Sequence, residues 1–109
     1  MNDAQVLLVL THMPDADSAQ RMADALVASR AAACVNILGA CHAVYRWQGK
    51  IESVQELPLL IKTTRAAYAR VEVLIREHHP YELPEIIAVP VDAGSAAYLQ
   101  WVVQETTLP

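Results

Sequence analysis

Apolar side chains follow two kinds of pattern along the strands that this chain predicts. Residues 5–11 and 85–91 are apolar at nearly every position, which is typical of strands buried on both faces. Residues 34–47 and 51–63 instead alternate between apolar and polar positions, with Gln48-Gly49 as a turn signal between them. The pattern therefore predicts two buried strands and one long β-hairpin.

The predicted hairpin is unusually long. Each arm has about 13–16 residues, and at ~3.3 Å per residue an arm reaches roughly 45 Å, farther than a domain of this size is wide. Gly39 marks a bulge or bend in the first arm. Pro58, which has no N–H, implies a bulge or an unpaired edge in the second arm. Such a hairpin predicts that the protein assembles with other chains.

Three segments carry apolar residues at helical spacing. The first begins at Asp17 as N-cap, with Gln20 three residues later, and ends near Arg30. Thr64 caps the second, which Pro80 stops. The apolar stripe of that second helix comprises Ala67, Tyr68, Val71, Leu74, Ile75 and His78. A third helix, capped by Ser95, is apolar nearly all round, which predicts burial on two sides and contact with another subunit.

The order of elements is βαββαβα, in one domain over residues 1–109. Its first six elements predict the α+β class with a ferredoxin-like arrangement. In this arrangement two helices cover one face of a four-stranded antiparallel sheet, and the C-terminal helix is an addition. Long strands leave open sheet edges, and closed symmetric pairing between subunits covers such edges economically.

Charge and composition exclude several functions. The net charge is −4 and no Lys/Arg cluster exists, which argues against nucleic-acid binding. No apolar run approaches the ~20 residues needed to span a bilayer, so no membrane insertion is expected. The polar start of the chain lacks the basic region of a secretory signal, which predicts a cytoplasmic protein. Cys34 and Cys41 lie seven residues apart and predict neither a disulfide framework nor a zinc site.

The pair His78-His79 is a candidate metal site at the end of the second helix. Imidazole suits copper, zinc and nickel, although two histidines need further ligands or a second subunit. Alternatively, His78 completes the apolar stripe of its helix and His79 caps the last carbonyl groups. Both interpretations stay open on spacing alone.

Glu56 and Lys62 are charged residues of the second arm, at an even spacing that places them on one face. They form either an exposed face or ion pair, or a ligand site with Tyr81 and Glu85 in a cleft between subunits. Catalysis has weaker support. Cys41 and its neighbour point to opposite faces, and the chain has no nucleophile elbow, P-loop or dinucleotide fingerprint. No enzyme activity and no organic cofactor are therefore predicted.

An ordered set of short motifs spans most of the chain. The motifs are Ala32-Ala33-Cys34-Val35-Asn36-Ile37, Tyr45-x-Trp47-x-Gly49-Lys50-Ile51, Glu56, Ile61-Lys62-Thr63, His79-Pro80-Tyr81-x-x-Pro84-Glu85-Ile86 and Tyr98-Leu99-x-Trp101. Together they resemble the CutA divalent-cation tolerance proteins from Val6 to about Val103. The resemblance implies a ferredoxin-like homotrimer, packed through hairpins and C-terminal helix, that is linked to tolerance of Cu²⁺ or another divalent cation.

The resemblance also shapes the site prediction. The metal candidates are His78 and His79, and the expected inter-subunit cleft comprises Tyr45, Trp47, Glu56, Lys62, Tyr81 and Glu85. The family's subunits are similar to trimeric nitrogen-regulatory signalling proteins, so the alternative function is a small-molecule sensor with its ligand in that cleft.

Two positions depart from the family pattern. Ala43 stands where members often carry Ser, and Thr11 stands where some carry a Cys proposed to bind copper. The second change removes a soft thiolate ligand and weakens a Cu(I) site. The neighbouring His12 could substitute only if the chain bends after Thr11.

Overall fold

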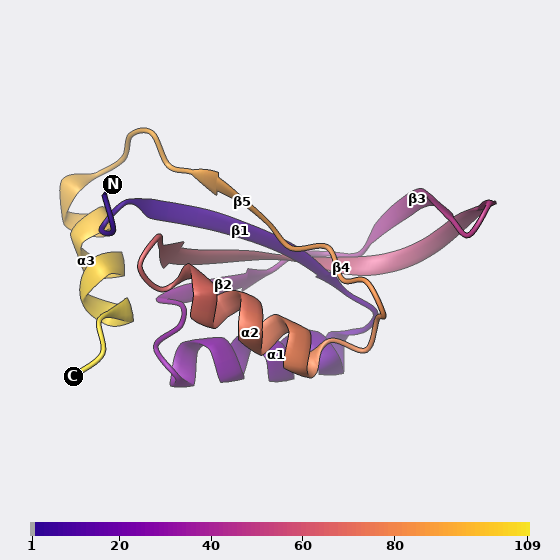
Figure 1. Cartoon of the computed structure of the whole chain (residues 1–109), viewed down its shortest axis with the longest axis horizontal. Helices are drawn as coiled ribbons and strands as arrows, with labels where there is room; N and C mark the ends of the chain where they lie inside the picture. The colour runs from indigo at the N-terminus through magenta and orange to yellow at the C-terminus, as the bar shows by residue number, and fades with distance from the viewer. Residues whose placement is uncertain (1) are drawn as a thin grey trace.

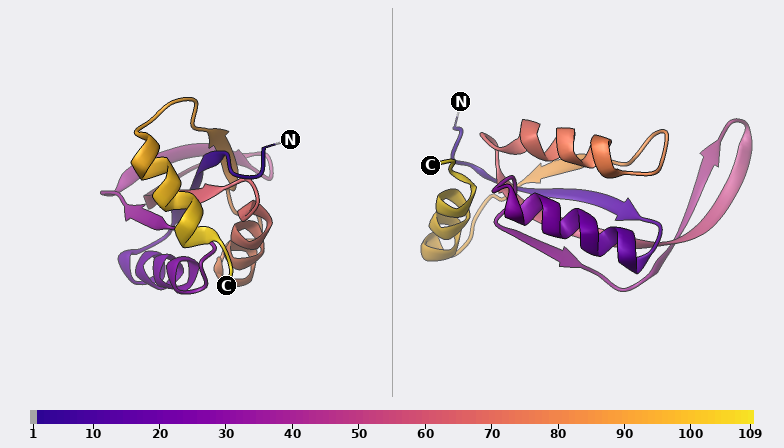
Figure 2. Two further views of the ribbon diagram at one scale, coloured as in Figure 1. Left: turned by 90° about the vertical axis from the view of Figure 1, so that its left-hand side faces the viewer. Right: turned by 90° about the horizontal axis from the view of Figure 1, so that it is seen from below.

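The computed structural model describes residues 2–109 and confirms the predicted α+β class (Figure 1). Its elements in chain order are β1 (Val6–Met13), α1 (Ala16–Ala28), β2 (Cys34–Ile37), β3 (Cys41–Trp47), β4 (Lys50–Thr64), α2 (Tyr68–His78), β5 (Ile87–Pro90) and α3 (Ala96–Thr106). Helices α1 and α2 lie side by side on one face of the sheet, and α3 lies at the end away from the hairpin tip (Figure 2).

All strand pairs are antiparallel, and β4 is the central strand. It pairs with β1 on one side and with β2 and then β3 on the other, while β5 pairs with the outer edge of β1. The sheet thus has five strands rather than the predicted four, because the first arm of the hairpin divides into β2 and β3.

The division lies where Gly39 and Pro58 predicted an irregularity. Ile37 pairs with Leu59 and Cys41 pairs with Glu56, so three residues of the first arm oppose two of β4. The carbonyl of Pro58 accepts from the N–H of Leu38, and a strand residue directs its N–H and C=O to the same side. Pro58 has no N–H to donate, and the position of that missing N–H faces the gap between β2 and β3, where the first arm does not pair.

The hairpin turns tightly at Gln48 and Gly49, whose φ angles are 50° and 79°. Positive φ at both central residues is the requirement of a type I′ turn, which suits the twist of the flanking strands. The molecule measures 44 × 26 × 24 Å, and the tip of the hairpin projects well beyond the helices (Figure 1). The second arm of the hairpin, β4, has 15 residues and so has the length expected from the sequence.

The core lies between the sheet and helices α1 and α2. Odd-numbered residues of β1 and β4 face the helices, because alternate strand residues share a face. The fully buried members of the core include Val9, Met13, Met22, Leu26, Leu59, Ile61, Val71 and Ile75.

Helix α1 begins two residues earlier than predicted. Asp15, not Asp17, is the N-cap: its Oδ1 accepts from the N–H of Ser18 at 2.8 Å. This backbone hydrogen bond lowers the pKa of the Asp15 carboxyl below its ordinary value. Strand β1 also runs on to Met13 instead of breaking after Thr11, because its last residues still pair with β4.

Helix α2 begins after Thr64, which remains in β4. The Thr64 hydroxyl accepts from the N–H of Ala67, so it closes the turn that leads into the helix rather than capping the helix itself. His78 is exposed and does not complete the apolar stripe. The buried residues of α2 are Val71 and Ile75, so the stripe ends one turn before the helix does.

The prediction that β5 is buried on both faces is wrong for a single chain. All four of its residues are exposed, because β5 is an edge strand that pairs with β1 on one side and with no strand of residues 2–109 on the other. Ser95 does cap α3, through a hydrogen bond from the N–H of Tyr98. None of the helices in residues 2–109 is long and apolar enough to cross a membrane.

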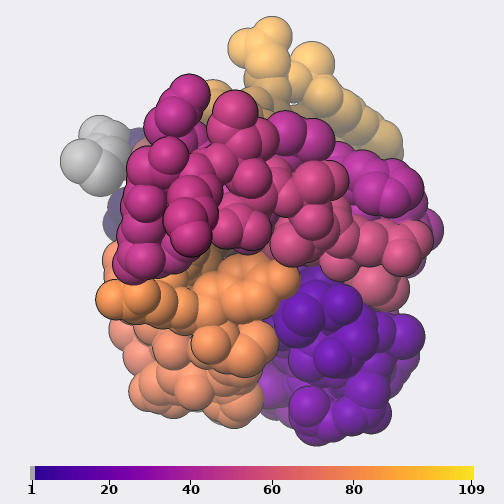
Figure 3. Space-filling model, turned by 90° about the vertical axis from the view of Figure 1, so that its right-hand side faces the viewer, coloured from indigo at the N-terminus to yellow at the C-terminus, as the bar shows by residue number. Residues whose placement is uncertain are grey.

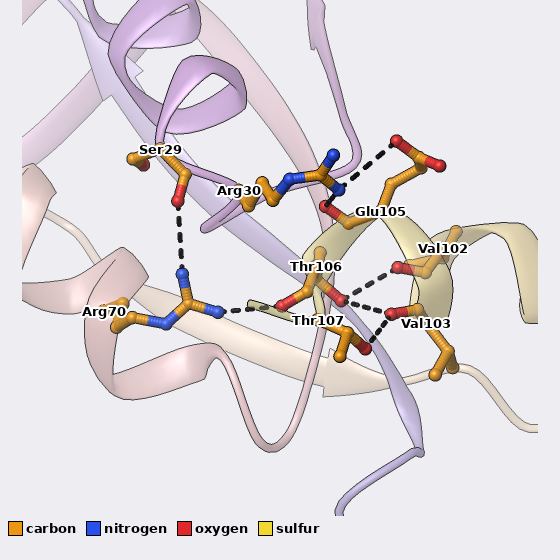
Figure 4. Close-up of polar contacts among 8 residues, drawn as sticks. All are labelled: Ser29, Arg30, Arg70, Val102, Val103, Glu105, Thr106 and Thr107. Carbon is orange, nitrogen blue, oxygen red and sulfur yellow. Dashed lines mark hydrogen bonds and ion pairs between the residues drawn. The ribbon is translucent and has the colours of Figure 1, made fainter. Parts of the chain in front are cut away.

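One arginine ties the C-terminal end of α3 to the helical layer (Figure 4). Arg70 of α2 donates to the carbonyl of Thr106 at 2.8 Å and to the carbonyl of Ser29 at 3.4 Å. Arg30 adds an ion pair with Glu105 at 3.6 Å. These contacts satisfy carbonyl groups at the ends of two helices, where no intrahelical donor is available.

Candidate functional site

A cleft of about 640 Å³ opens beneath the hairpin, between β3–β4 and the segment that follows α2. Figure 3 faces this end of the molecule, where the magenta hairpin overhangs the orange segment and the surface between them is hollowed. The polar and aromatic residues that line the cleft are His12, Tyr45, Trp47, Glu56, Tyr81, Glu82 and Glu85.

The buried carboxylate of the cleft is Glu56, whose side chain is only 7% exposed. His12 Nδ1 lies 3.3 Å from its Oε1 and 3.8 Å from Oε1 of Glu85. His12 and Glu56 meet because even-numbered residues of β1 and β4 point away from the helices. Two carboxylates therefore converge on one imidazole at the floor of the cleft.

Tyr81 lies against the same carboxylate. Burial, together with a hydrogen bond to Glu56, raises the pKa of Tyr81 to about 12. The phenol thus keeps its proton at neutral pH and can donate it to the Glu56 carboxylate, which satisfies part of a buried charge.

His79 is buried beneath Tyr81, and both of its ring nitrogens are engaged. Nε2 lies 2.6 Å from the carbonyl oxygen of His12, and Nδ1 accepts from the N–H of Tyr81 at 3.2 Å. A carbonyl only accepts, so Nε2 carries the hydrogen. The ring also packs on Tyr81, with centroids 4.7 Å apart. His79 therefore joins the end of β1 to the segment that carries Tyr81.

The two histidines of the predicted metal pair point in different directions. His78 is exposed at the end of α2, with Nδ1 3.1 Å from the carbonyl of Leu74, whereas His79 faces inward. Within the part of the chain that the structure describes, no group of three or more His, Cys, Asp or Glu side chains is placed to hold a metal ion.

Lys62 does not join the other cleft residues within one chain. It shares a face with Glu56, but six residues at ~3.3 Å place it roughly 20 Å farther along β4. There its ammonium group contacts Asn36 Oδ1 and lies 3.9 Å from Cys34 Sγ. Alternation identified the common face correctly but could not bring the two charges together.

His12 is the cleft residue that the sequence analysis did not place there. We expected it to contribute only if the chain bent after Thr11, yet β1 continues to pair with β4 through Met13, and simple alternation turns His12 toward Glu56. Thr11 points the other way, into the core, and its buried hydroxyl oxygen has no hydrogen-bond partner. Thr11, one of the two departures from the family pattern, thus faces away from the cleft.

These features define a ferredoxin-like α+β subunit whose extended hairpin overhangs an acidic, aromatic cleft. The chain belongs to the CutA1 divalent ion tolerance protein family, whose model matches residues 7–105.

Relatives and solved structures agree with this assignment. The divalent-cation tolerance protein CutA of Thermus thermophilus is 42% identical over 99 residues, which are 91% of this chain and 96% of that protein. The crystal structure of CutA from Xylella fastidiosa matches with a TM-score of 0.92 and 43% identity, covering 94% of this chain and 99% of that one.

The compartments of similar proteins differ. The chloroplastic protein CutA of Arabidopsis thaliana is 34% identical over 92% of this chain, which spans only 55% of that protein. A structure from Archaeoglobus fulgidus, described as a periplasmic divalent cation tolerance protein, matches with a TM-score of 0.90 and 29% identity over 94% of this chain and 99% of that one. Family membership therefore does not by itself assign the predicted cytoplasmic location.

Proposed function

We propose that this chain acts in divalent-cation tolerance as a cytoplasmic homotrimer, whose subunits join through the hairpin, β5 and α3. The observation that carries the proposal is the distribution of exposed large apolar side chains, which gather on these three elements. They include Val44, Tyr45, Ile51, Ile87, Val89, Tyr98 and Trp101. Apolar surface on neighbouring elements is typical of a protein interface, and a closed assembly also covers the open edge at β5.

Light scattering on the purified chain tests this assembly. The expected mass is three times 12.0 kDa at low micromolar concentration. Ile51→Asp places a charge on the outer side of the hairpin, where the side chain is 69% exposed, and should lower the mass. Glu72→Gln, on the outer face of α2, serves as a control that leaves the mass unchanged. A stable monomer for the unaltered chain would refute the proposal.

The proposal includes binding of Cu²⁺ or another divalent cation to the assembled protein, with His78 as a direct ligand. The exposed imidazole of His78 needs donors from a neighbouring subunit, since one chain offers no group of three ligands among residues 2–109. His79 can join only by giving up its hydrogen bonds to His12 and Tyr81, so binding should be weak. No catalytic step is part of this proposal.

Calorimetry with Cu²⁺ separates the roles of the histidines. His78→Ala should weaken Cu²⁺ binding, because it removes the accessible imidazole, while His42→Ala, an exposed histidine on β3, is the matched control. If His78→Ala binds Cu²⁺ as tightly as the unaltered chain does, His78 is not a ligand.

The cleft supports a second candidate function, the sensing of a small molecule. Its volume of about 640 Å³ lies within the range of ligand pockets, and five of the six predicted cleft residues line it in a single chain. Lys62 would have to come from a neighbouring subunit. A thermal-shift screen of nucleotides and metabolites tests this function, and a screen without any shift would argue against it.

A further inference from the structure

We propose that the cleft beneath the hairpin binds an organic ammonium cation. The inference rests on the second candidate function, small-molecule sensing, and names the class of ligand for that same cleft. Three properties of its walls support this class: aromatic faces, an excess of negative charge and a carboxylate held in place.

The aromatic walls come from two sides of the cleft. Tyr45 and Trp47 belong to β3, and Tyr81 belongs to the segment after α2. The electron-rich faces of Tyr and Trp attract cations, and several rings around one pocket favour ammonium groups that carry carbon substituents. A small hydrated metal ion gains little from such walls, whereas an organic cation can contact them along its whole surface.

The charged groups of the cleft are predominantly acidic. Three glutamates, Glu56, Glu82 and Glu85, line the cleft beside the single imidazole of His12, so acidic side chains outnumber basic ones. No Lys or Arg side chain of residues 2–109 lines the cleft. Phosphate-bearing ligands such as nucleotides are therefore disfavoured, because their recognition relies on cationic side chains.

Glu56 has the preorganisation expected of a ligand-binding group. Its side chain is more than nine-tenths buried, yet it lines the cleft. Tyr81 positions it from one side and His12 from another, while His79 fixes the backbone of both neighbours. A carboxylate held in this way binds a cation without the entropy cost of ordering a mobile side chain.

Trp47 offers a direct reporter of occupancy. The chain has two tryptophans, Trp47 and Trp101, so Trp101→Phe leaves the cleft residue as the only indole. Choline is the probe, and its neutral isostere dimethylbutanol, in which carbon replaces the quaternary nitrogen, is the matched control. We expect choline to change Trp47 fluorescence saturably, and dimethylbutanol to bind at least about tenfold more weakly.

Carboxylate variants test the role of charge. Glu56→Gln keeps the shape of the side chain and should weaken choline binding about tenfold. Asp24→Asn, which removes a carboxylate from the exposed face of α1, should leave it unchanged. Equal binding of choline and dimethylbutanol, or a Glu56→Gln variant that binds choline normally, would overturn the proposal.

Choline binding can fail or succeed independently of trimer formation and Cu²⁺ binding, so the two proposals are tested separately. A trimer that binds Cu²⁺ but not choline overturns this inference and leaves the cation-tolerance assignment standing. A monomer that still binds choline selectively refutes the trimer and supports the inference. If the cleft opens to choline only when a dissociating hairpin variant such as Ile51→Asp is used, its occupant is a side chain of a neighbouring copy and the inference is wrong.

Discussion

The sharpest stability prediction concerns the neighbouring residues His78 and His79. Replacing His79 by Ala removes the donor to the His12 carbonyl and the acceptor for the Tyr81 N–H. Each of these hydrogen bonds contributes about 0.5–1.5 kcal/mol, and the ring contact with Tyr81 about as much again. The free energy of unfolding should therefore fall by about 1.5–4.5 kcal/mol.

His78→Ala is the matched control, because the same residue type is removed one position away. Its imidazole is exposed, and surface substitutions usually change stability by less than about 0.5 kcal/mol. His79→Gln should be intermediate, since its amide can still donate to the His12 carbonyl but leaves the Tyr81 N–H unpaired.

The assay is equilibrium unfolding in denaturant at one fixed protein concentration, because the stability of an oligomer depends on concentration. The midpoints of the variants can be compared directly only if the unfolding free energy falls with denaturant concentration at the same slope in each variant. If His79→Ala and His78→Ala unfold within about 0.5 kcal/mol of each other, the argument that His79 holds β1 to the segment after α2 is refuted.

Three further predictions follow from local geometry. Asp15→Ala should lower the melting temperature at neutral pH. Folding lowers the pKa of Asp15 from 3.8, so the ionised carboxylate contributes its full stabilisation above pH 3.8. The difference in melting temperature between the variant and the unaltered chain should therefore disappear as the pH falls through the lower, folded-state pKa. Gly49→Ala should destabilise by roughly 1–2 kcal/mol, because φ is 79° there, whereas Gly39→Ala, with open space and no positive φ, should be tolerated in thermal melts. A chelator should leave the melting curve of metal-free protein unchanged, while Cu²⁺ at a hundredfold excess over its dissociation constant should add about 2.7 kcal/mol of stability; collapse of the fold on chelation would contradict this.

Local chemistry made most of the fold predictable. The turn at Gln48-Gly49, the irregularity at Gly39 and the cap at Ser95 each depend on one residue and its neighbours. The error at the start of α1 arose where two local signals competed. Asp15 and Asp17 both precede the apolar stripe of α1, and only pairing with β4, a tertiary contact, decides how far β1 runs and therefore which aspartate becomes the cap.

The cleft was predictable in part for the same reason. Alternation placed Glu56 and Lys62 on one face of the strand, but the distance between them depends on the number of residues that separate them and not on alternation. His79 gave no sequence signal for its role, because a buried imidazole that bridges two backbone segments has the same spacing as a metal ligand. Only the direction of the ring distinguishes them.

The position of the cleft connects assembly to ligand binding. Its walls come from the hairpin on one side and from the segment fixed by His79 on the other, so any change in the angle of the hairpin alters the cleft. The same hairpin carries Val44 and Ile51 on its exposed surface, where the proposed neighbours would pack. Packing of a neighbour would therefore restrict the hairpin to one angle and preorganise Tyr45 and Trp47 over Glu56. By reciprocal linkage, a ligand that prefers this closed cleft should also tighten the trimer, and dilution experiments that follow dissociation with and without choline would measure that coupling.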